Sequence, residues 1–246
     1  MTLAEILQPS SALFLDFDGT MVDIAPLPSA VHVPEPLLGV LRNLHEDLKG
    51  AIAVISGRPI EQIDAFLRPL RLPVAGVHGA ERRGADGVLH LLEAQPLDHV
   101  EEAACLLAAQ NPGLLVENKR SSLALHYRQR PELQDLCLRI MQRAVDESPG
   151  ITLLRGKMVV EAKPGGASKG RAIEVFLEEQ PFAGRTPVFI GDDVTDEAGF
   201  STVQRLGGLG IKVGEGATCA WRRLPDPQAL RQELEAAVVA RPTRTT

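Results

Sequence analysis

Aromatic residues are scarce in this 246-residue chain, which has seven Phe, one Trp and one Tyr. Positive charge is also in deficit, because 26 Lys and Arg face 32 Asp and Glu and leave a net charge of −6. A protein that binds nucleic acid needs a basic face and aromatic rings on which bases stack. The composition therefore argues against a nucleic acid as partner.

The sequence also lacks long apolar runs and paired cysteines. Its longest purely apolar run, Ala103–Ala109, is far too short to span a bilayer. Residues 1–10 carry no basic patch followed by an apolar core, so we expect no signal peptide. The three cysteines, Cys105, Cys137 and Cys219, are odd in number and far apart, which fits neither a disulfide framework nor a zinc site. We therefore expect a cytoplasmic protein without a membrane partner.

Short apolar runs alternate with helical patterns along most of the chain. Apolar residues at three- and four-residue spacing after Pro59 and after Ser168 are typical of helices that cover a sheet. The pattern predicts an α/β fold with a Rossmann-like parallel sheet and helices on both faces. The runs expected to form its strands are 11–17, 51–56, 187–192 and 209–213.

The segment from His99 to Ala162 breaks this rhythm. Its pattern indicates helix, two strands, helix and two strands, which is typical of an antiparallel sheet backed by helices. Cys137 and Met141 fall on one apolar helical stripe, so we expect both in a core. We predict an α+β cap domain at 99–162, inserted into a core of residues 1–98 and 163–246.

Two carboxylates end the first predicted strand, in Asp16-Phe17-Asp18-Gly19-Thr20. Asp16 and Asp18 are two residues apart, so they project to one side of an extended chain, at the carboxyl edge where parallel sheets bind ligands. A simpler interpretation is an Asp-Gly turn with a capping aspartate.

A second group of carboxylates follows a later strand, in residues 191–197. Asp192 and Asp193 lie just past that strand, whereas Asp196 has a simpler interpretation as a helix cap. Carboxylates that converge on one crevice repel each other unless a cation lies among them. Because oxygen-only ligands favour Mg²⁺, the sequence predicts a magnesium site.

Two further motifs offer groups to a phosphate. Residues 56–59, Ser-Gly-Arg-Pro, end a strand and begin a helix, so they present a hydroxyl, backbone N–H groups and a positive helix terminus. Lys169 begins the next core helix, where its charge would balance a phosphoryl group. Taken singly, Ser56 and Ser168 are helix caps and Lys169 is a solvated surface residue. The presence of all four motifs in this order favours a phosphate site.

These four motifs resemble those of the haloacid dehalogenase (HAD) superfamily, and the resemblance covers nearly the whole chain. It implies that Asp16 is the nucleophile, that Asp18 is first the general acid and then the base, and that Lys169 assists catalysis. Whether Asp193 or Asp196 joins the metal shell is left open. The binding positions implied are Ser56, Gly57 and Lys169 for phosphate, and Asp16, the backbone carbonyl of Asp18 and Asp192 for Mg²⁺.

Strand alternation gives the inserted segment one polar and one apolar sheet face. Fixed polar groups on such a face would read the hydroxyls of a sugar phosphate, although a solvated face is the simpler alternative. On the last strand, Lys157 is expected to alternate with Met158. The predicted polar side holds Glu117, Lys119, Ala124, His126, Arg128, Lys157, Val159 and Glu161, and the opposite side holds Leu123, Leu125, Tyr127, Met158, Val160 and Ala162.

Stretches 76–81, 117–119, 123–128, 156–164 and 191–197 are closely similar to trehalose-6-phosphate phosphatases. The similarity implies a phosphomonoester hydrolase that uses Mg²⁺ to convert trehalose 6-phosphate to trehalose and phosphate through an aspartyl phosphate. The sugar-binding positions that it implies are Arg58, Glu117, Lys119, Arg128, Lys157 and Glu161.

Two alternatives stay open. A HAD phosphatase that acts on another sugar phosphate, such as sucrose 6-phosphate, would carry the same core motifs. A non-enzymatic phospho-acceptor switch also gathers Asp, Ser or Thr and Lys around Mg²⁺. Asp18 and the cap argue against a switch, because a switch needs a long-lived phosphate and not a resident acid and base.

Overall fold

The computed structural model describes residues 1–25, 27, 30–92, 96–119 and 122–239. The chain divides into two compact units. We call residues 1–90, 168–192 and the chain from 196 onward the core unit, and residues 91–167 with 193–195 the inserted unit. The domain boundaries after residues 98 and 162 stay a prediction.

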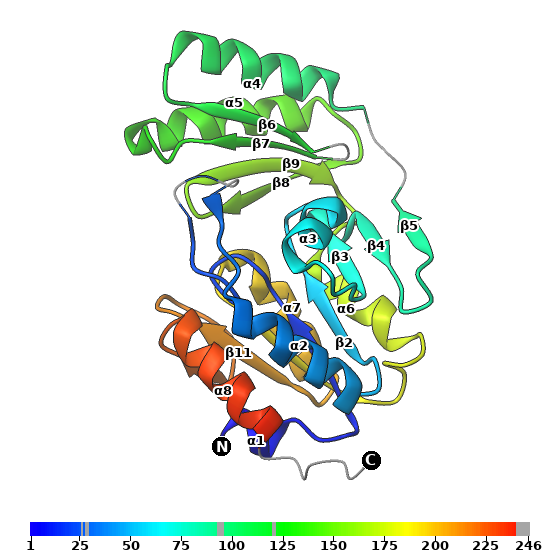
Figure 1. Ribbon diagram of the computed structural model, residues 1–246. Coiled ribbons are helices and arrows are strands. Elements are labelled where there is room, and N and C mark those ends of the chain that lie inside the picture. The colour runs from blue at the N-terminus through cyan, green and yellow to red at the C-terminus, as the bar shows by residue number, and fades with distance from the viewer. Residues whose placement is uncertain (26, 28–29, 93–95, 120–121, 240–246) are drawn as a thin grey trace. The chain divides into compact units, whose positions relative to one another are not determined.

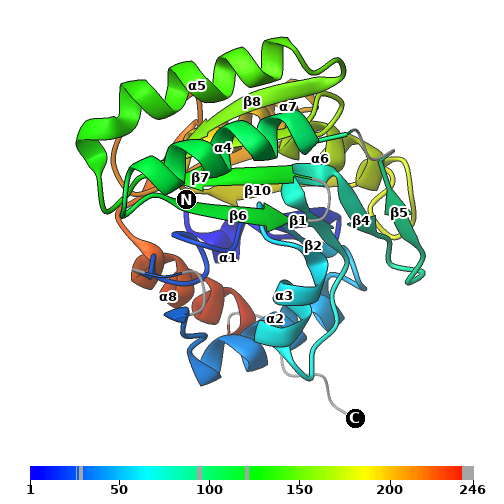
Figure 2. The ribbon, with the colours of Figure 1, turned by 90° about the horizontal axis from the view of Figure 1, so that it is seen from above.

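β1 lies near the centre of the core sheet. Over the described residues this sheet has eight strands, in the order β12-β11-β10-β1-β2-β3-β4-β5 (Figures 1 and 2). β1 runs parallel to β10 and to β2, and all of its residues are buried, which confirms the predicted parallel α/β sheet. The strands are β1 (Ser11–Leu15), β2 (Ile52–Ile55), β3 (Val74–Gly76), β4 (Glu81–Arg83), β5 (Leu89–Leu91), β10 (Thr186–Gly191), β11 (Leu209–Val213) and β12 (Arg222–Leu224).

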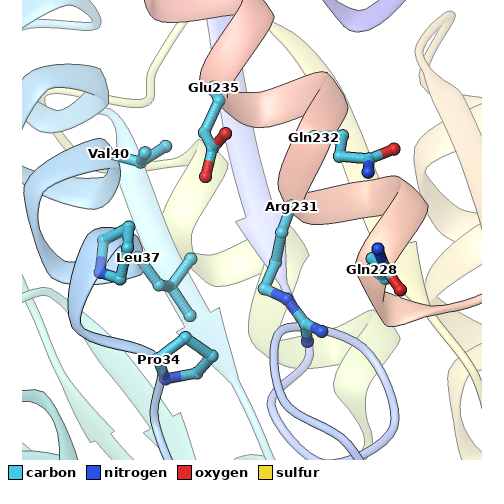
Figure 3. A pocket seen from close by; sticks show the side chains of 8 residues that line it. Pro34, Leu37, Val40, Gln228, Arg231, Gln232 and Glu235 are labelled. Atoms are coloured by element: carbon cyan, nitrogen blue, oxygen red, sulfur yellow. The ribbon is translucent and has the colours of Figure 1, made fainter.

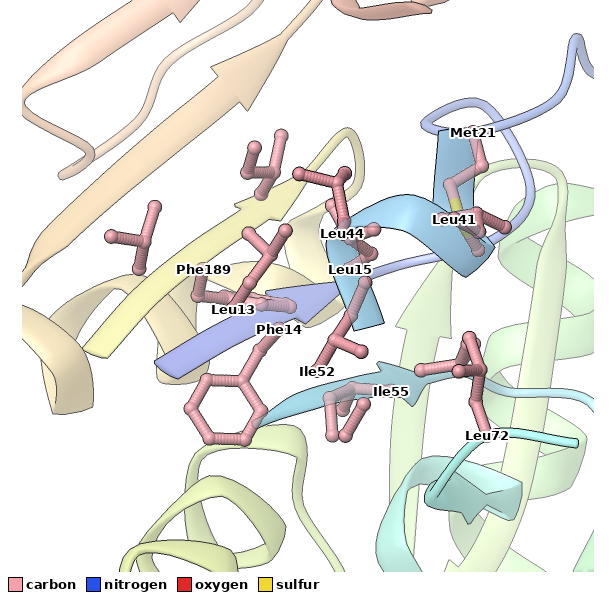
Figure 4. Close-up of a cluster of buried hydrophobic side chains, with 14 of the residues drawn as sticks. Leu13, Phe14, Leu15, Met21, Leu41, Leu44, Ile52, Ile55, Leu72 and Phe189 are labelled. Carbon is pink, nitrogen blue, oxygen red and sulfur yellow. The ribbon is translucent and has the colours of Figure 1, made fainter. Parts of the chain in front are cut away.

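Helices pack on both faces of the core sheet. α1 and α2 pack against α8 on one face, and α6 packs against α7 on the other (Figure 1). Leu13 and Leu15 point to the side of Leu44, and Phe14 points to the opposite side (Figure 4). Phe14 stacks there on Phe182, with ring centroids 5.4 Å apart. The helices are α1 (Leu3–Ile6), α2 (Glu35–Asp47), α3 (Ile60–Leu67), α6 (Lys169–Leu177), α7 (Glu197–Arg205) and α8 (Pro227–Val239).

The inserted unit has the predicted order of helix, two strands, helix and two strands. Over the described residues its strands form one antiparallel sheet, β6-β7-β9-β8, with α4 and α5 packed together on one face (Figure 1). Leu123, Leu125 and Tyr127 lie in the core of this unit, and Cys137 and Met141 are fully buried there, as predicted. The elements are α4 (Asp98–Gln110), β6 (Leu115–Lys119), β7 (Ser122–His126), α5 (Gln134–Asp146), β8 (Ile151–Gly156) and β9 (Val159–Pro164).

Four residues assigned to strands by alternation lie outside them, namely Tyr127, Arg128, Lys157 and Met158. Lys157 and Met158 form the turn between β8 and β9, where Met158 has a φ of +63°. This left-handed conformation interrupts the extended chain, so the predicted alternation of Lys157 with Met158 is wrong. Arg128 is exposed and follows the end of β7 at His126.

No helix within the described ranges is long and apolar enough to cross a membrane. A pocket of about 250 Å³ lies between α2 and α8 of the core unit (Figure 3). Arg231 closes one side of it and donates a hydrogen bond to the backbone oxygen of Met21 at 3.1 Å. The residues that line the pocket are Pro34, Pro36, Leu37, Val40, Gln228, Arg231, Gln232 and Glu235, and the sequence assigned a chemical role to none of them.

Candidate active site

Asp16 is the first residue after β1 and is almost completely buried. Its backbone N–H donates to the oxygen of Ile190 at 2.9 Å, so β10 fixes the point from which the side chain starts. Oδ1 accepts a hydrogen bond from Nζ of Lys169 at 2.7 Å, and Oδ2 accepts one from Oγ1 of Thr20 at 3.1 Å. The predicted nucleophile is therefore held in one orientation, between a cation and a hydroxyl.

Lys169 opens α6 with its side chain only 3% exposed. Oγ of Ser168 accepts a hydrogen bond from the backbone N–H of Arg171 at 3.0 Å and so caps this helix. Nζ of Lys169 donates to Asp16 at 2.7 Å and to Asp196 at 2.6 Å. The interpretation of Ser168 as a helix cap is confirmed, whereas the interpretation of Lys169 as a solvated surface residue is wrong.

Asp196 ties three segments of the core unit together. It is fully buried, and it accepts hydrogen bonds from Lys169 through Oδ1 at 2.6 Å and from the backbone N–H of Asp192 through Oδ2 at 3.0 Å. Although Asp196 occupies the N-cap position of α7, its side chain makes no capping hydrogen bond. Nζ of Lys212, in β11, donates to the backbone oxygen of Asp192. The loop after β10 is thus held from both sides.

Asp16, Asp192 and Asp196 form one cluster of carboxylates. A ligand oxygen from each lies within 4.8 Å of the others. Gly19 makes room for this approach, because it has a φ of +78° and a Cβ there would collide with the Asp192 carboxylate. The donors are all oxygen, and three carboxylates, of which two bind the ammonium of Lys169, together exceed that one positive charge. Both features fit a divalent cation.

The pKa of Asp16 lies well above its ordinary value. Burial is the largest cause, and the carboxylates of Asp196 and Asp192 add to it, while Lys169 works in the opposite direction. Burial also lowers the pKa of Lys169, but Asp16 and Asp196 outweigh burial and the pKa of Lys169 is raised overall. The lysine is therefore a permanent cation, and a second positive charge would stabilise the ionised form of Asp16.

Asp18 is held by Arg58, which follows β2. Nε of Arg58 donates to Oδ2 of Asp18 at 2.5 Å, and Nη2 donates to Oδ1 at 2.7 Å. The guanidinium carbon also lies 5.1 Å from the ring centroid of Phe66 in α3. The structure thus brings the predicted acid and base together with a residue that the sequence assigned to sugar binding.

The loop after β2 contains Ser56 and Gly57. Ser56 is 1% exposed, and its Oγ accepts a hydrogen bond from the backbone N–H of Arg58 at 3.1 Å. Gly57 packs so closely against the imidazole of His78 that a Cβ would collide with it. Val77 and His78 have φ values of +48° and +54°, a conformation that costs on the order of 1–3 kcal/mol per residue and is concentrated at functional sites. His78 therefore packs against the loop after β2.

The polar face of the inserted sheet contains two ion pairs. Glu117 Oε2 lies 2.8 Å from Nε2 of His126, and Glu161 Oε2 accepts a hydrogen bond from Nζ of Lys119 at 3.0 Å. Ser122 Oγ donates to the second oxygen of Glu161 at 2.6 Å. The alternation of charges along β6 predicted Glu117 and Lys119. The contacts of His126 with Glu117 and of Ser122 with Glu161 became visible only in the structure.

The chain has the fold of the haloacid dehalogenase-like proteins. A haloacid dehalogenase-like hydrolase from B. subtilis superposes over 91% of this chain and 99% of its own, with a TM-score of 0.68 and 14% identity. The C-terminal domain of the C. albicans trehalose-6-phosphate phosphatase superposes over 94% of this chain and 92% of its own, with a TM-score of 0.86 and 20% identity. At these identities the two structures establish the fold.

The sequence establishes the family. The profile described as trehalose-phosphatase matches residues 14–223. The trehalose-6-phosphate phosphatase of Escherichia coli (strain K12) is 48% identical over 215 residues, which cover 86% of this chain and 80% of the relative. The chain belongs to the trehalose-phosphatase family.

Proposed function

We propose that this protein is a phosphomonoester hydrolase that converts trehalose 6-phosphate to trehalose and inorganic phosphate. The observation that carries the proposal is the buried pair of Asp16 and Lys169, 2.7 Å apart at the carboxyl end of β1. A carboxylate fixed in a water-poor site beside a permanent cation can attack phosphorus while the cation offsets the charge of the phosphoryl oxygens. Membership of the trehalose-phosphatase family supports the same reaction.

In the proposed first step, a carboxylate oxygen of Asp16 forms a bond to phosphorus, and the bond from phosphorus to the sugar oxygen breaks. Asp18 donates its proton to the departing sugar oxygen. In the second step Asp18, now a carboxylate, takes a proton from water as the water oxygen attacks phosphorus. Breakage of the aspartyl phosphate then frees Asp16 and releases phosphate. Two displacements in series replace one difficult step by two easier ones.

The proposed cofactor is Mg²⁺, held by the carboxylates of Asp16 and Asp192 and by the backbone carbonyl of Asp18. When bound, Mg²⁺ supplies positive charge to the phosphoryl oxygens. Asp196 acts here as a positioning residue, because its two oxygens already accept hydrogen bonds from Lys169 and from the backbone of Asp192. Ser56, Gly57 and Lys169 bind the phosphate in this scheme, with a hydroxyl, a backbone N–H and an ammonium as donors.

The inserted unit supplies sugar recognition in this proposal. Its polar face presents Glu117, Lys119 and Glu161 in fixed pairs, and groups fixed in this way discriminate a hydroxyl that they bind from one that is missing. Arg128, Lys157 and Arg58 complete the proposed set. Cys105, Cys137 and Cys219 are free thiols, which supports the cytoplasm as the compartment.

A substrate panel tests the proposal. Phosphate release is measured on trehalose 6-phosphate, sucrose 6-phosphate, glucose 6-phosphate and p-nitrophenyl phosphate, before and after chelation and again after addition of Mg²⁺. We expect kcat/KM to be highest for trehalose 6-phosphate, by about 100-fold or more over the other sugar phosphates, and activity to depend on Mg²⁺. A higher kcat/KM for another sugar phosphate would overturn the substrate, and a single turnover without sustained release would overturn the hydrolase.

A further inference from the structure

The two glutamates on the polar face of the inserted sheet differ in how many of their oxygens are engaged. Glu161 has a side chain 5% exposed and uses both oxygens, which accept hydrogen bonds from Ser122 and Lys119. Glu117 has a side chain 24% exposed, and among the described residues its one hydrogen bond joins Oε2 to Nε2 of His126 at 2.8 Å. Glu117 therefore keeps Oε1 as an accessible acceptor.

Strand register brings His126 to Glu117. β6 and β7 pair antiparallel, with Glu117 opposite Ala124 and Leu115 opposite His126. His126 is thus two residues from the cross-strand partner of Glu117, and two residues along a strand is the distance that returns a side chain to the same face. The residue directly opposite Glu117 is Ala124. Because its side chain is only a methyl group, it leaves room for the carboxylate of Glu117 and the imidazole of His126 to meet diagonally across the two strands.

We propose that His126 is a positioning residue for sugar recognition: its Nε2–H fixes the carboxylate of Glu117 so that Oε1 accepts a hydrogen bond from a hydroxyl of the sugar. This inference rests on the proposed function, in which Glu117 binds the sugar. A free glutamate side chain samples many rotamers, and ordering it during binding weakens binding. His126 orders it before the substrate arrives.

The charges around Glu117 support this role. The hydrogen bond from His126 is the largest cause that lowers the pKa of Glu117, burial opposes it, and Lys119 acts in the same direction as His126. Glu161, which faces the same group, raises the pKa by a smaller amount. An ionised carboxylate forms a stronger hydrogen bond with a hydroxyl than a neutral one does.

A second His–Glu pair in the same unit provides a matched control. Nε2 of His99, in α4, lies 2.8 Å from Oε2 of Glu147, the same atoms at the same distance as in the His126 pair. Both side chains of the control pair are 51% exposed; His99 lies in α4 and Glu147 is the C-cap residue of α5, so neither lies on the polar strands. Replacement of His99 removes a His–Glu contact between the same atoms and leaves Glu117 and its neighbours on the polar strands unchanged. Glu147 keeps a hydrogen bond from Arg143 at 3.3 Å.

The test compares His126→Phe, His126→Gln and His99→Phe on trehalose 6-phosphate and on p-nitrophenyl phosphate, which has no sugar. Phe removes the donor at similar volume, and Gln restores an N–H donor at similar reach. We expect His126→Phe to raise KM for trehalose 6-phosphate about tenfold, the effect of one lost positioned hydrogen bond, with the kinetics on p-nitrophenyl phosphate unchanged. We expect His126→Gln and His99→Phe to stay within about twofold of wild type.

A double-mutant cycle shows whether His126 acts through Glu117. Glu117→Gln is combined with His126→Phe, and we expect the second change to add less than about twofold to KM in the Glu117→Gln background. Melting temperatures of all variants check that each is folded.

Three results would overturn the inference: an unchanged KM in His126→Phe, an equal loss in His126→Gln and His126→Phe, or a full additional loss in the Glu117→Gln background. If the wild-type protein does not hydrolyse trehalose 6-phosphate, the double-mutant cycle is measured with the sugar phosphate that it hydrolyses best. Failure of the proposed substrate is thereby distinguished from failure of the positioning role.

Discussion

Arg58 and Asp18 form a two-point ion pair that joins the loops after β2 and β1. The core unit contains a near copy of this pair away from the chemistry. Arg82 donates from Nη1 and Nη2 to the two oxygens of Glu179, both at 2.7 Å, and its guanidinium lies 5.3 Å from the ring centroid of Phe176. The planar guanidinium fixes both carboxylates in a way that an ammonium cannot, because a lysine lacks the fork of paired donors.

We therefore predict that Arg58→Lys lowers kcat by about 10- to 100-fold on trehalose 6-phosphate and on p-nitrophenyl phosphate alike, since the loss of position at Asp18 affects proton transfer to either leaving group. Arg82→Lys is the matched control, because it breaks another two-point arginine–carboxylate pair of similar burial and leaves Asp18 in place. Steady-state kinetics of the two variants check the prediction. Equal losses of kcat in both would show that the effect is on general stability.

Asp16→Asn separates catalysis from stability. We predict that it lowers kcat by at least about 1,000-fold, because an amide cannot act as the nucleophile. In metal-free protein the same substitution should increase the free energy of unfolding, although it removes activity. The folded-state pKa of Asp16 is raised, chiefly by burial, so the ionisation of Asp16 costs stability as the pH rises above about 3.9, the ordinary value. An asparagine does not ionise and avoids this cost.

With chelator at pH 7, Asp16→Asn should therefore melt about 3 °C above wild type, which is about 1 kcal/mol for a chain of this size. The difference should shrink as the pH falls towards 4, because the unfolded state then also begins to protonate Asp16 and the cost of ionisation disappears. Thermal melting at the two pH values checks both expectations. A variant that melts below wild type at pH 7 would mean that the ion pair with Lys169 outweighs burial.

Asp192 and Asp193 are adjacent carboxylates for which we predict different roles. Asp192 belongs to the cluster with Asp16 and Asp196, whereas Asp193 groups with the inserted unit. A ligand that binds only the folded state adds about 2.7 kcal/mol of stability at 100 times its Kd. Mg²⁺ should raise the melting temperature of wild type and of Asp193→Asn, and most of the rise should vanish in Asp192→Asn. The same loss in Asp193→Asn would place that residue in the metal shell.

The lowered pKa of Glu117 predicts a pH dependence of sugar binding. The main cause of the shift is the hydrogen bond from His126, with Lys119 assisting and burial and Glu161 opposing. Because the pKa is lowered, Glu117 stays ionised to a more acidic pH than an ordinary glutamate does. The KM for trehalose 6-phosphate should therefore begin to rise at a higher pH in His126→Phe than in wild type as the solution is acidified.

The ratio of the two KM values is the quantity to measure between pH 4 and 7, because protonation of the substrate phosphate cancels in it. We expect a ratio that grows as the pH falls towards the ordinary range of a glutamate and levels off below the pKa of wild-type Glu117. A ratio that is constant across this range would contradict the prediction.

The parts of the site that follow strands could be predicted from the sequence. Asp16, Ser56 and Asp192 each come after an apolar run, and parallel pairing of β1 with β2 and β10 necessarily brings the ends of those runs to one edge. Helix capping could also be predicted from the sequence, as for Ser168, which caps α6. These features depend on short-range pattern alone, so no tertiary information was needed.

The pairings between distant segments could not be predicted in this way. β4 reads Glu-Arg-Arg, which is typical of an exposed strand, yet all three residues are buried. They are accommodated because Glu81 accepts a hydrogen bond from the backbone of Ile60, Arg82 pairs with Glu179, and Arg83 pairs with Asp64. A buried charge is tolerable only with such partners, and in Arg82 the partner lies 97 residues away. The hydrogen bonds between Arg58 and Asp18 could not be predicted either, because the two residues are 40 positions apart in the sequence.

The central place of β1 imposes an order on biosynthesis. Ser11 to Leu15 pair on one side with Thr186 to Ile190, so a ribosome must make most of the chain before this strand gains its second neighbour. Among the residues that the structure describes, the strand pairings of the inserted unit fall between residues 115 and 164 and are complete by then. The nascent polypeptide therefore carries an unfinished core sheet until residues 186–190 are made, and Asp16 can pair with Lys169 only after the 153-residue separation between them has been synthesised.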